Sequence, residues 1–122
     1  MADPAKSECW PCHTAKVQAW AGTGHSTLFK LGIDGVASSH YGESCIECHT
    51  VGYNTETEAV NDGFDDIQLA LGWTFPSTPQ PGEWDSLCIN FPELAKRGGI
   101  QCENCHGPVS EHKTNFDPAK ID

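Results

Sequence analysis

Short amphipathic stretches divided by glycine and proline run along the chain, and apolar residues seldom form long runs. Residues 14–21 mix apolar and polar positions ahead of two glycines, which predicts a short helix. A turn or helix is expected over 26–31, and a helix over 91–96 that two further glycines close. The proline-rich stretch 73–83 is expected to be irregular, and 55–66 to be an acidic, solvated loop. We therefore predict a mainly α fold with much irregular loop and little or no β-sheet.

The hydrophobic content limits what the chain can build alone. Its 122 residues suit one compact domain over 1–122, yet only 38% of them are hydrophobic. Such a chain would form a thin core, so we expect a bound group to fill the interior. The formal net charge of -10 argues against nucleic acid, whose phosphates require Lys and Arg on the binding surface. No apolar stretch approaches the roughly 18 residues of a membrane span.

Cysteine spacing supplies the candidate chemistry. Six of the seven cysteines form three equally spaced pairs, and a histidine follows each pair at once: Cys9, Cys12 and His13; Cys45, Cys48 and His49; Cys102, Cys105 and His106. C-x-x-C-H is the attachment signature of c-type haem. The two sulfurs add to the vinyl groups of the porphyrin, and the histidine ligates the iron as its proximal ligand. We therefore predict three covalently bound haems c, which would also fill the thin interior.

Zinc and thiol redox chemistry explain the pattern less well. Structural zinc needs tetrahedral sets of Cys and His, and three pairs do not divide neatly into such sets. Zinc also gives no reason for a histidine directly after every pair. A thioredoxin-like motif would occur once, near a βαβ pattern that is absent here. The seventh cysteine, Cys88, is expected to be a buried small residue, with an intermolecular cross-link as the alternative.

Three further histidines, His25, His40 and His112, equal the number of distal positions that three six-coordinate irons would need. The one methionine is Met1, so bis-histidine ligation is expected, with lower potentials than His/Met ligation gives. His112 follows His106 closely, across a predicted helix start at Pro108, and His40 closely precedes the second pair. Neither is well placed to reach the far side of its nearest haem. We expect ligands to be exchanged between haems, and the pairing stays open.

On these residues the sequence resembles the multihaem cytochromes of the cytochrome c-554 type, which are related to the hydroxylamine oxidoreductase and nitrite reductase cytochromes. The resemblance is carried by residues 20–26, 45–54 and 99–112. It implies a small multihaem cytochrome c fold wrapped around stacked haems. It also implies that His25 is a distal ligand to a haem other than the first, and His112 matches a histidine of the family's Cys-His-Gly-Pro-x-Ser-x-His stretch. Members often continue to a fourth motif, so this chain is either a tri-haem variant or a piece of a longer protein.

Three functions compete. Electron transfer is the leading hypothesis, because three haems in so small a chain would lie near one another, and the acidic surface would steer redox protein partners with basic surfaces. The second is a haem enzyme with one open iron that acts on a small nitrogen or sulfur compound. The third is a homo-oligomeric subunit of an extracellular conducting filament. Covalent haem attachment normally takes place outside the cytoplasm, so a periplasmic or extracellular location is expected, with an export signal already removed.

Overall fold

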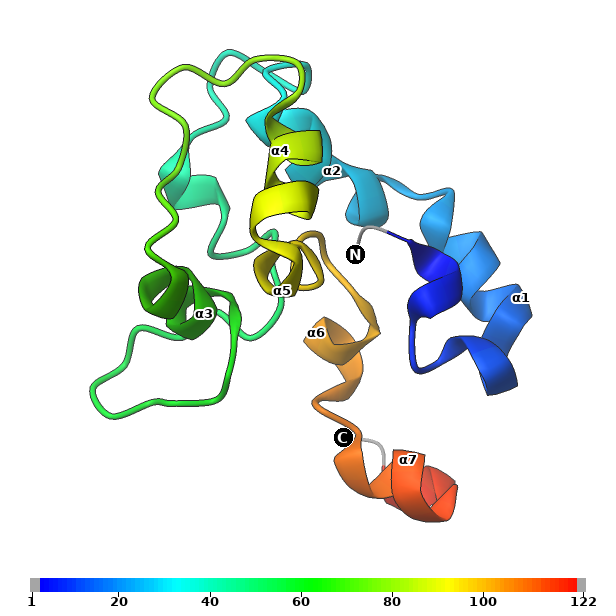
Figure 1. Cartoon of the computed structure of the whole chain (residues 1–122). Coiled ribbons are helices and arrows are strands. Elements are labelled where there is room, and N and C mark those ends of the chain that lie inside the picture. Colours follow the sequence, from blue (N-terminus) through cyan, green and yellow to red (C-terminus); the bar gives the residue numbers. More distant parts are fainter. Residues whose placement is uncertain (1–2, 121–122) are drawn as a thin grey trace.

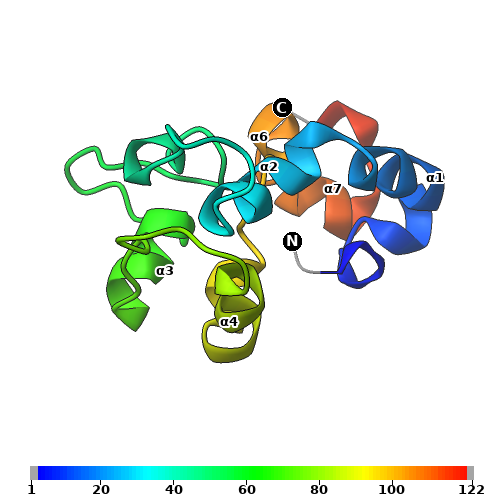
Figure 2. The same ribbon diagram turned by 90° about the horizontal axis from the view of Figure 1, so that it is seen from above.

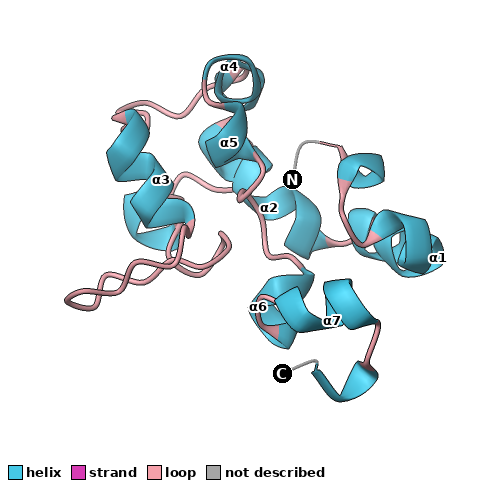
Figure 3. Ribbon diagram, turned by 60° about the horizontal axis from the view of Figure 1, so that its bottom comes forward, coloured by secondary structure: helices cyan, strands magenta, loops and turns pink. Residues whose placement is uncertain are grey.

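The computed structural model describes residues 3–120, and within them the chain is mainly helical (Figures 1 and 3). The α-helices are α1 (Trp10–Ala21), α2 (Gly24–Ile33), α3 (Phe64–Leu71), α4 (Glu83–Asn90), α5 (Pro92–Ala95), α6 (Cys102–His106) and α7 (Ser110–Asn115). Single turns of 3-10 helix cover Pro4–Lys6, Glu43–Cys45 and Pro118–Lys120. The described part of the chain has no strand, only an isolated antiparallel bridge between Thr50 and Gly98. The expectation of a mainly α fold without a sheet is confirmed.

Several expected boundaries shift. The predicted helix over 14–21 is α1, which starts earlier, at Trp10, because Pro11 is suited to a first helical turn. The expected turn or helix over 26–31 is part of α2, and the expected helix over 91–96 is the short α5. Irregular backbone over 73–83 is confirmed except for its last residue, where α4 begins.

Two expectations near acidic residues and prolines are wrong in part. The acidic stretch 55–66 is a loop only as far as Gly63, where α3 starts; Asp65 and Asp66 lie in its first turn. Carboxylates are favoured there by the partial positive charge at a helix N-terminus, and Phe64 anchors the turn in the core. The helix predicted to start at Pro108 begins two residues later, as α7, and α6 precedes it without having been expected.

One hydrophobic cluster holds the middle of the chain together. Its buried members come from α2, the segment 41–46, α3, α4 and α5: Phe29, Ile33, Tyr41, Ile46, Phe64, Trp84, Leu87, Leu94 and Ala95. Phe29 packs edge-on against Phe64 and Trp84, with ring centroids 5.4 and 6.0 Å apart. In contrast, α1 buries only Val17, and no residue of α6 or α7 is buried. The ends of the chain therefore have little core of their own, as the low hydrophobic content predicted.

Residues 97–101, here called the linking segment, connect these ends to the core. The backbone N–H of Gly99 donates to the His49 carbonyl and that of Ile100 to the His25 carbonyl, both at 3.0 Å. The Ile100 carbonyl in turn accepts from the Trp20 indole N–H at 2.7 Å. Figure 2 shows α1, α6 and α7 on one side of the molecule, with α3 and the loop before it on the other. The linking segment thus joins α1, α2 and the second cysteine motif to the start of α6.

The linking segment requires glycine at two positions where it passes α2. A Cβ on Gly98 would lie 2.8 Å from the Phe29 ring and 3.1 Å from the Trp84 ring. Gly99 has a φ of +89°, and a Cβ there would lie 3.2 Å from the Ser26 carbonyl oxygen. At positions 98 and 99 the segment can therefore pass this close to α2 only without a side chain. Within residues 3–120, no helix is both long and apolar enough to span a lipid bilayer.

We expect Gly99→Ala to lower the free energy of unfolding by about 1–3 kcal/mol, because alanine is strained at this φ and its methyl group meets the α2 backbone. Gly24→Ala is the matched control: it lies at the start of α2 with open space around its Cβ position, and should leave stability unchanged or slightly raised. Denaturant unfolding followed by circular dichroism measures both. Equal stability of the two variants would contradict the described path.

Candidate metal centres

The three cysteine motifs share one pattern of exposure. In each, the first cysteine (Cys9, Cys45 or Cys102) is partly buried and the second (Cys12, Cys48 or Cys105) is exposed, and all six are free thiols. The first motif opens α1, the second begins at the last residue of a 3-10 turn, and the third is α6 itself. Every pair therefore presents one thiol to solvent.

In the first motif, local backbone turns the histidine away from the helix path. His13 has φ -122° and ψ 34°, a non-helical conformation inside α1, although its N–H still bonds to the Cys9 carbonyl at 2.9 Å. Its side chain is exposed. The kink thus places the His13 imidazole outside the regular path of the helix.

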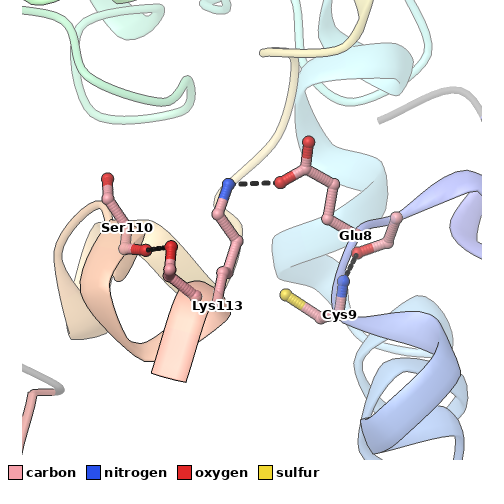
Figure 4. Close-up of polar contacts among 6 residues, drawn as sticks. Glu8, Cys9, Ser110 and Lys113 are labelled. Atoms are coloured by element: carbon pink, nitrogen blue, oxygen red, sulfur yellow. Dashed lines mark hydrogen bonds and ion pairs between the residues drawn. The ribbon is translucent and has the colours of Figure 1, made fainter. Parts of the chain in front are cut away.

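The first and third motifs meet. Burial raises the pKa of the Cys102 thiol, and the neighbouring Cys9 thiol raises it further. Beside them Lys113 of α7 forms an ion pair with Glu8 (Figure 4). The same hydrogen-bonded contact raises the pKa of the Lys113 ammonium. Two motif cysteines separated by most of the sequence, Cys9 and Cys102, are thus adjacent in space.

The two histidines of this region also lie close together. The ring centroids of His13 and His112 are 6.2 Å apart, with 29° between the ring planes. The His112 Nδ1 lies 3.0 Å from the Asp117 carbonyl oxygen. A carbonyl can only accept, so Nδ1 carries the proton, and in the neutral ring Nε2 then holds the lone pair that can bind a metal. A ligating histidine usually has its second nitrogen held in this way.

In the second motif His49 has a comparable partner. Its Nδ1 lies 3.3 Å from the Tyr41 hydroxyl oxygen, and the two rings are nearly parallel with centroids 5.6 Å apart. Burial lowers the pKa of His49, and the nearby charge of His25 lowers it further. Both effects favour the neutral imidazole, the form that binds a metal. Burial likewise raises the pKa of the Tyr41 hydroxyl, with a smaller contribution from Cys45, so the phenol stays protonated.

The structure therefore brings together some of the predicted ligands and not others. His112 lies against His13, and His25 lies within electrostatic range of His49. His40 and His106 are exposed, and within residues 3–120 no ring contact joins either to another histidine. The backbone N–H of His40 donates to the Ser38 hydroxyl at 3.1 Å.

Two side chains that the sequence did not single out fix the start of α6, and one of them, Asn104, connects the third motif to the residue directly after the second. The Asn104 amide donates to the Thr50 carbonyl at 2.8 Å, and its oxygen accepts from the Gln101 backbone N–H at the same distance. The Gln101 amide donates to the carbonyls of Lys96 and Gly98. Asn104 occupies a variable position of its C-x-x-C-H motif, so the motif pattern alone could not reveal this role. A Gln-x-x-Asn spacing at a helix start was the available signal.

Cys88 lies outside these motifs. It is partly buried in α4 and packs against the hydrophobic cluster. Burial, with a smaller contribution from Asp85, raises the pKa of its thiol, which favours the unreactive thiol form.

The donor set fits covalently attached haem. Free thiols in spaced pairs and histidines with Nδ1 engaged and Nε2 available are the groups that such attachment and iron ligation require. Within the described residues, no group of three or more His, Cys, Asp or Glu side chains is arranged to hold a metal ion by itself.

Comparison with known proteins agrees with this chemistry. The family model for cytochrome c554 and c-prime matches residues 8–68, half of the chain. The match includes the first two cysteine motifs together with His25 and His40. No curated protein and no solved structure gives a significant match.

We expect Asn104→Ala to lower the free energy of unfolding by about 1–3 kcal/mol, because the Gln101 N–H loses its acceptor and the Thr50 carbonyl its donor. Glu103→Ala changes the neighbouring exposed position of the same motif and should have little effect. Urea unfolding measures both. A destabilisation of the same size in both variants would show that the Asn104 contacts contribute nothing specific.

Proposed function

The chain belongs to the cytochrome c554 and c-prime family, and on that premise we propose that it transfers electrons through three covalently attached haems c with bis-histidine ligation. Haem c itself follows from the family and from the attachment motifs. We propose in addition that the chain binds three haems, that histidines are their axial ligands, and that the protein is a carrier rather than an enzyme.

The short distance between the His13 and His112 rings is the observation that best supports this proposal. Two metal–imidazole bonds of about 2 Å each, with the distance from each nitrogen to its ring centre, separate two axial imidazoles by roughly 6 Å between centroids. The observed separation is 6.2 Å, between residues at opposite ends of the chain. The Asp117 carbonyl leaves Nε2 of His112 available. We assign His13 and His112 as the axial pair of the first haem.

The other residues take the roles that the motifs indicate. The six paired cysteines form thioethers, and His49 and His106 are the proximal ligands of the second and third haems. His25 and His40 are the remaining candidates for distal ligands. When bound, each haem iron accepts or releases one electron.

The chain's own contribution is to hold the attachment points as a connected series. Cys9 and Cys102 place the first and third points side by side. The linking segment and Asn104 tie the second motif to the third. Two strong protein ligands on an iron also exclude substrates from it, which favours a carrier.

The charge of the chain supports the rest of the proposal. With a net charge of -10 before any haem propionates, the surface would attract redox partners with basic surfaces. Covalent haem attachment normally requires export, so a periplasmic or extracellular location is proposed with it.

A second candidate function has one observation in its favour. His106 is exposed and has no ring contact with another histidine in the described chain. Its iron would then be open to a small nitrogen or sulfur compound, or would take a histidine from a neighbouring subunit, as in a conducting filament.

The purified protein should carry the mass of three haems, and its reduced visible spectrum should not change with carbon monoxide, because every iron holds two strong ligands. Intact-mass spectrometry and dithionite-reduced spectra before and after carbon monoxide measure this. Fewer than three haems would overturn the proposed count. A carbon monoxide shift in about one third of the absorbance would favour the second candidate.

We expect His112→Ala to open one iron, so that about one third of the c-type absorbance responds to carbon monoxide while three haems stay attached. Thr114→Ala, an exposed position two residues further along α7, is the control and should leave the spectrum unchanged. An unchanged His112→Ala spectrum would refute the pairing of His112 with His13.

A further inference from the structure

Tyr41 lies beside the histidine of the second motif in a way that the attachment chemistry does not require. We propose that Tyr41 is a positioning residue for His49: its hydroxyl oxygen accepts a hydrogen bond from the His49 Nδ1–H, fixes the ring with Nε2 free for iron, and lowers the reduction potential of that haem. The inference rests on the proposed function, since His49 ligates iron only if the second motif carries haem.

The contact has both a polar and an aromatic part. The Tyr41 oxygen is 3.3 Å from His49 Nδ1. The two rings are 17° from parallel, with centroids 5.6 Å apart, and Phe75 stacks on Tyr41 with centroids 6.4 Å apart. Tyr41 therefore restricts both the position of the imidazole plane and its rotation about the Cβ–Cγ bond.

Tyr41 is itself fixed. Only 8% of its surface is exposed, and it belongs to the central hydrophobic cluster. A Cβ on Gly32 would lie 2.3 Å from its ring, so the phenol lies directly against the α2 backbone. Its backbone N–H donates to the Ser38 carbonyl at 3.2 Å. A side chain packed this closely can orient a ligand on the outer side of the cluster.

The proton arrangement follows from ligation. A neutral imidazole that binds through Nε2 carries its proton on Nδ1, so Nδ1 is the donor and the phenol oxygen the acceptor. A hydrogen bond from this N–H makes the ring a more basic ligand and favours ferric over ferrous iron. His112 uses the Asp117 carbonyl in the same position, so the two irons differ in the acceptor behind a histidine.

Tyr41→Phe keeps the ring and removes the acceptor. We expect three haems to stay attached and one potential to rise, so that at a fixed electrode potential the ratio of reduced to oxidised haem increases about two- to tenfold for that haem alone. Potentiometric titration with visible spectroscopy measures the potentials, and electron paramagnetic resonance of the oxidised protein should show one altered low-spin signal. Tyr53→Phe is the matched control, because Tyr53 packs against the same cluster and stacks on Phe64.

If Tyr41→Phe protein does not accumulate, replacing Tyr41 by 3-fluorotyrosine tests the same hydrogen bond with almost no change in shape. The chain has two tyrosines, so in Tyr53→Phe protein 3-fluorotyrosine replaces Tyr41 alone. Fluorine weakens the phenol oxygen as an acceptor, so the same potential should rise by less. Three attached haems with unchanged potentials would overturn the inference and leave the proposed function intact. A second motif without haem in the unaltered protein would overturn both.

Discussion

The backbone hydrogen bonds of the linking segment are the constraint on which the rest of this structure depends. Gly99 and Ile100, consecutive in sequence, donate to the carbonyls of His49 and His25, and Ile100 accepts from Trp20. These bonds hold α1, the start of α2 and the second motif in one arrangement, although α1 contributes no buried residue to the cluster that the other two share. Because glycine occupies positions 98 and 99, the segment approaches α2 closely enough to form them.

The small number of packing contacts in the protein is consistent with haem groups that fill part of its interior. The hydrophobic cluster serves the middle of the chain, while α1, α6 and α7 contribute almost no buried side chains. Helices of five to twelve residues with so little burial are marginal alone. Thioether links and axial ligands that join distant segments would supply the missing cohesion, and the same bonds would set the redox properties.

The chemistry was readable from the sequence because it depends on local spacing. Two residues between cysteines and a histidine directly after them identify the motif wherever the chain goes, and the family match confirms the resemblance. The mainly α class was also predictable, since no alternating pattern of useful length occurs. The features that the sequence did not predict depend on contacts between residues that are not close neighbours in the chain. The start of α4 is fixed by the Trp84 N–H donating to the Asp34 carboxylate, fifty residues away, and Tyr41 meets His49 through a gap that Gly32 leaves. No local sequence pattern indicates either contact. The pairing of each distal histidine with its haem stays a prediction for the same reason.

The contacts that join the two ends of the chain link residues far apart in sequence, and this affects the order in which the protein folds. Trp20 and Ile100 are 80 residues apart, and Glu8 and Lys113 are 105 apart. Contacts of this kind form late, because the loop between them must first be closed. Because synthesis proceeds from the N-terminus, the first two motifs are present before the residues that contact them from the other end of the chain. Haem attached to the emerging chain would therefore meet the first two cysteine pairs before the last helices have folded.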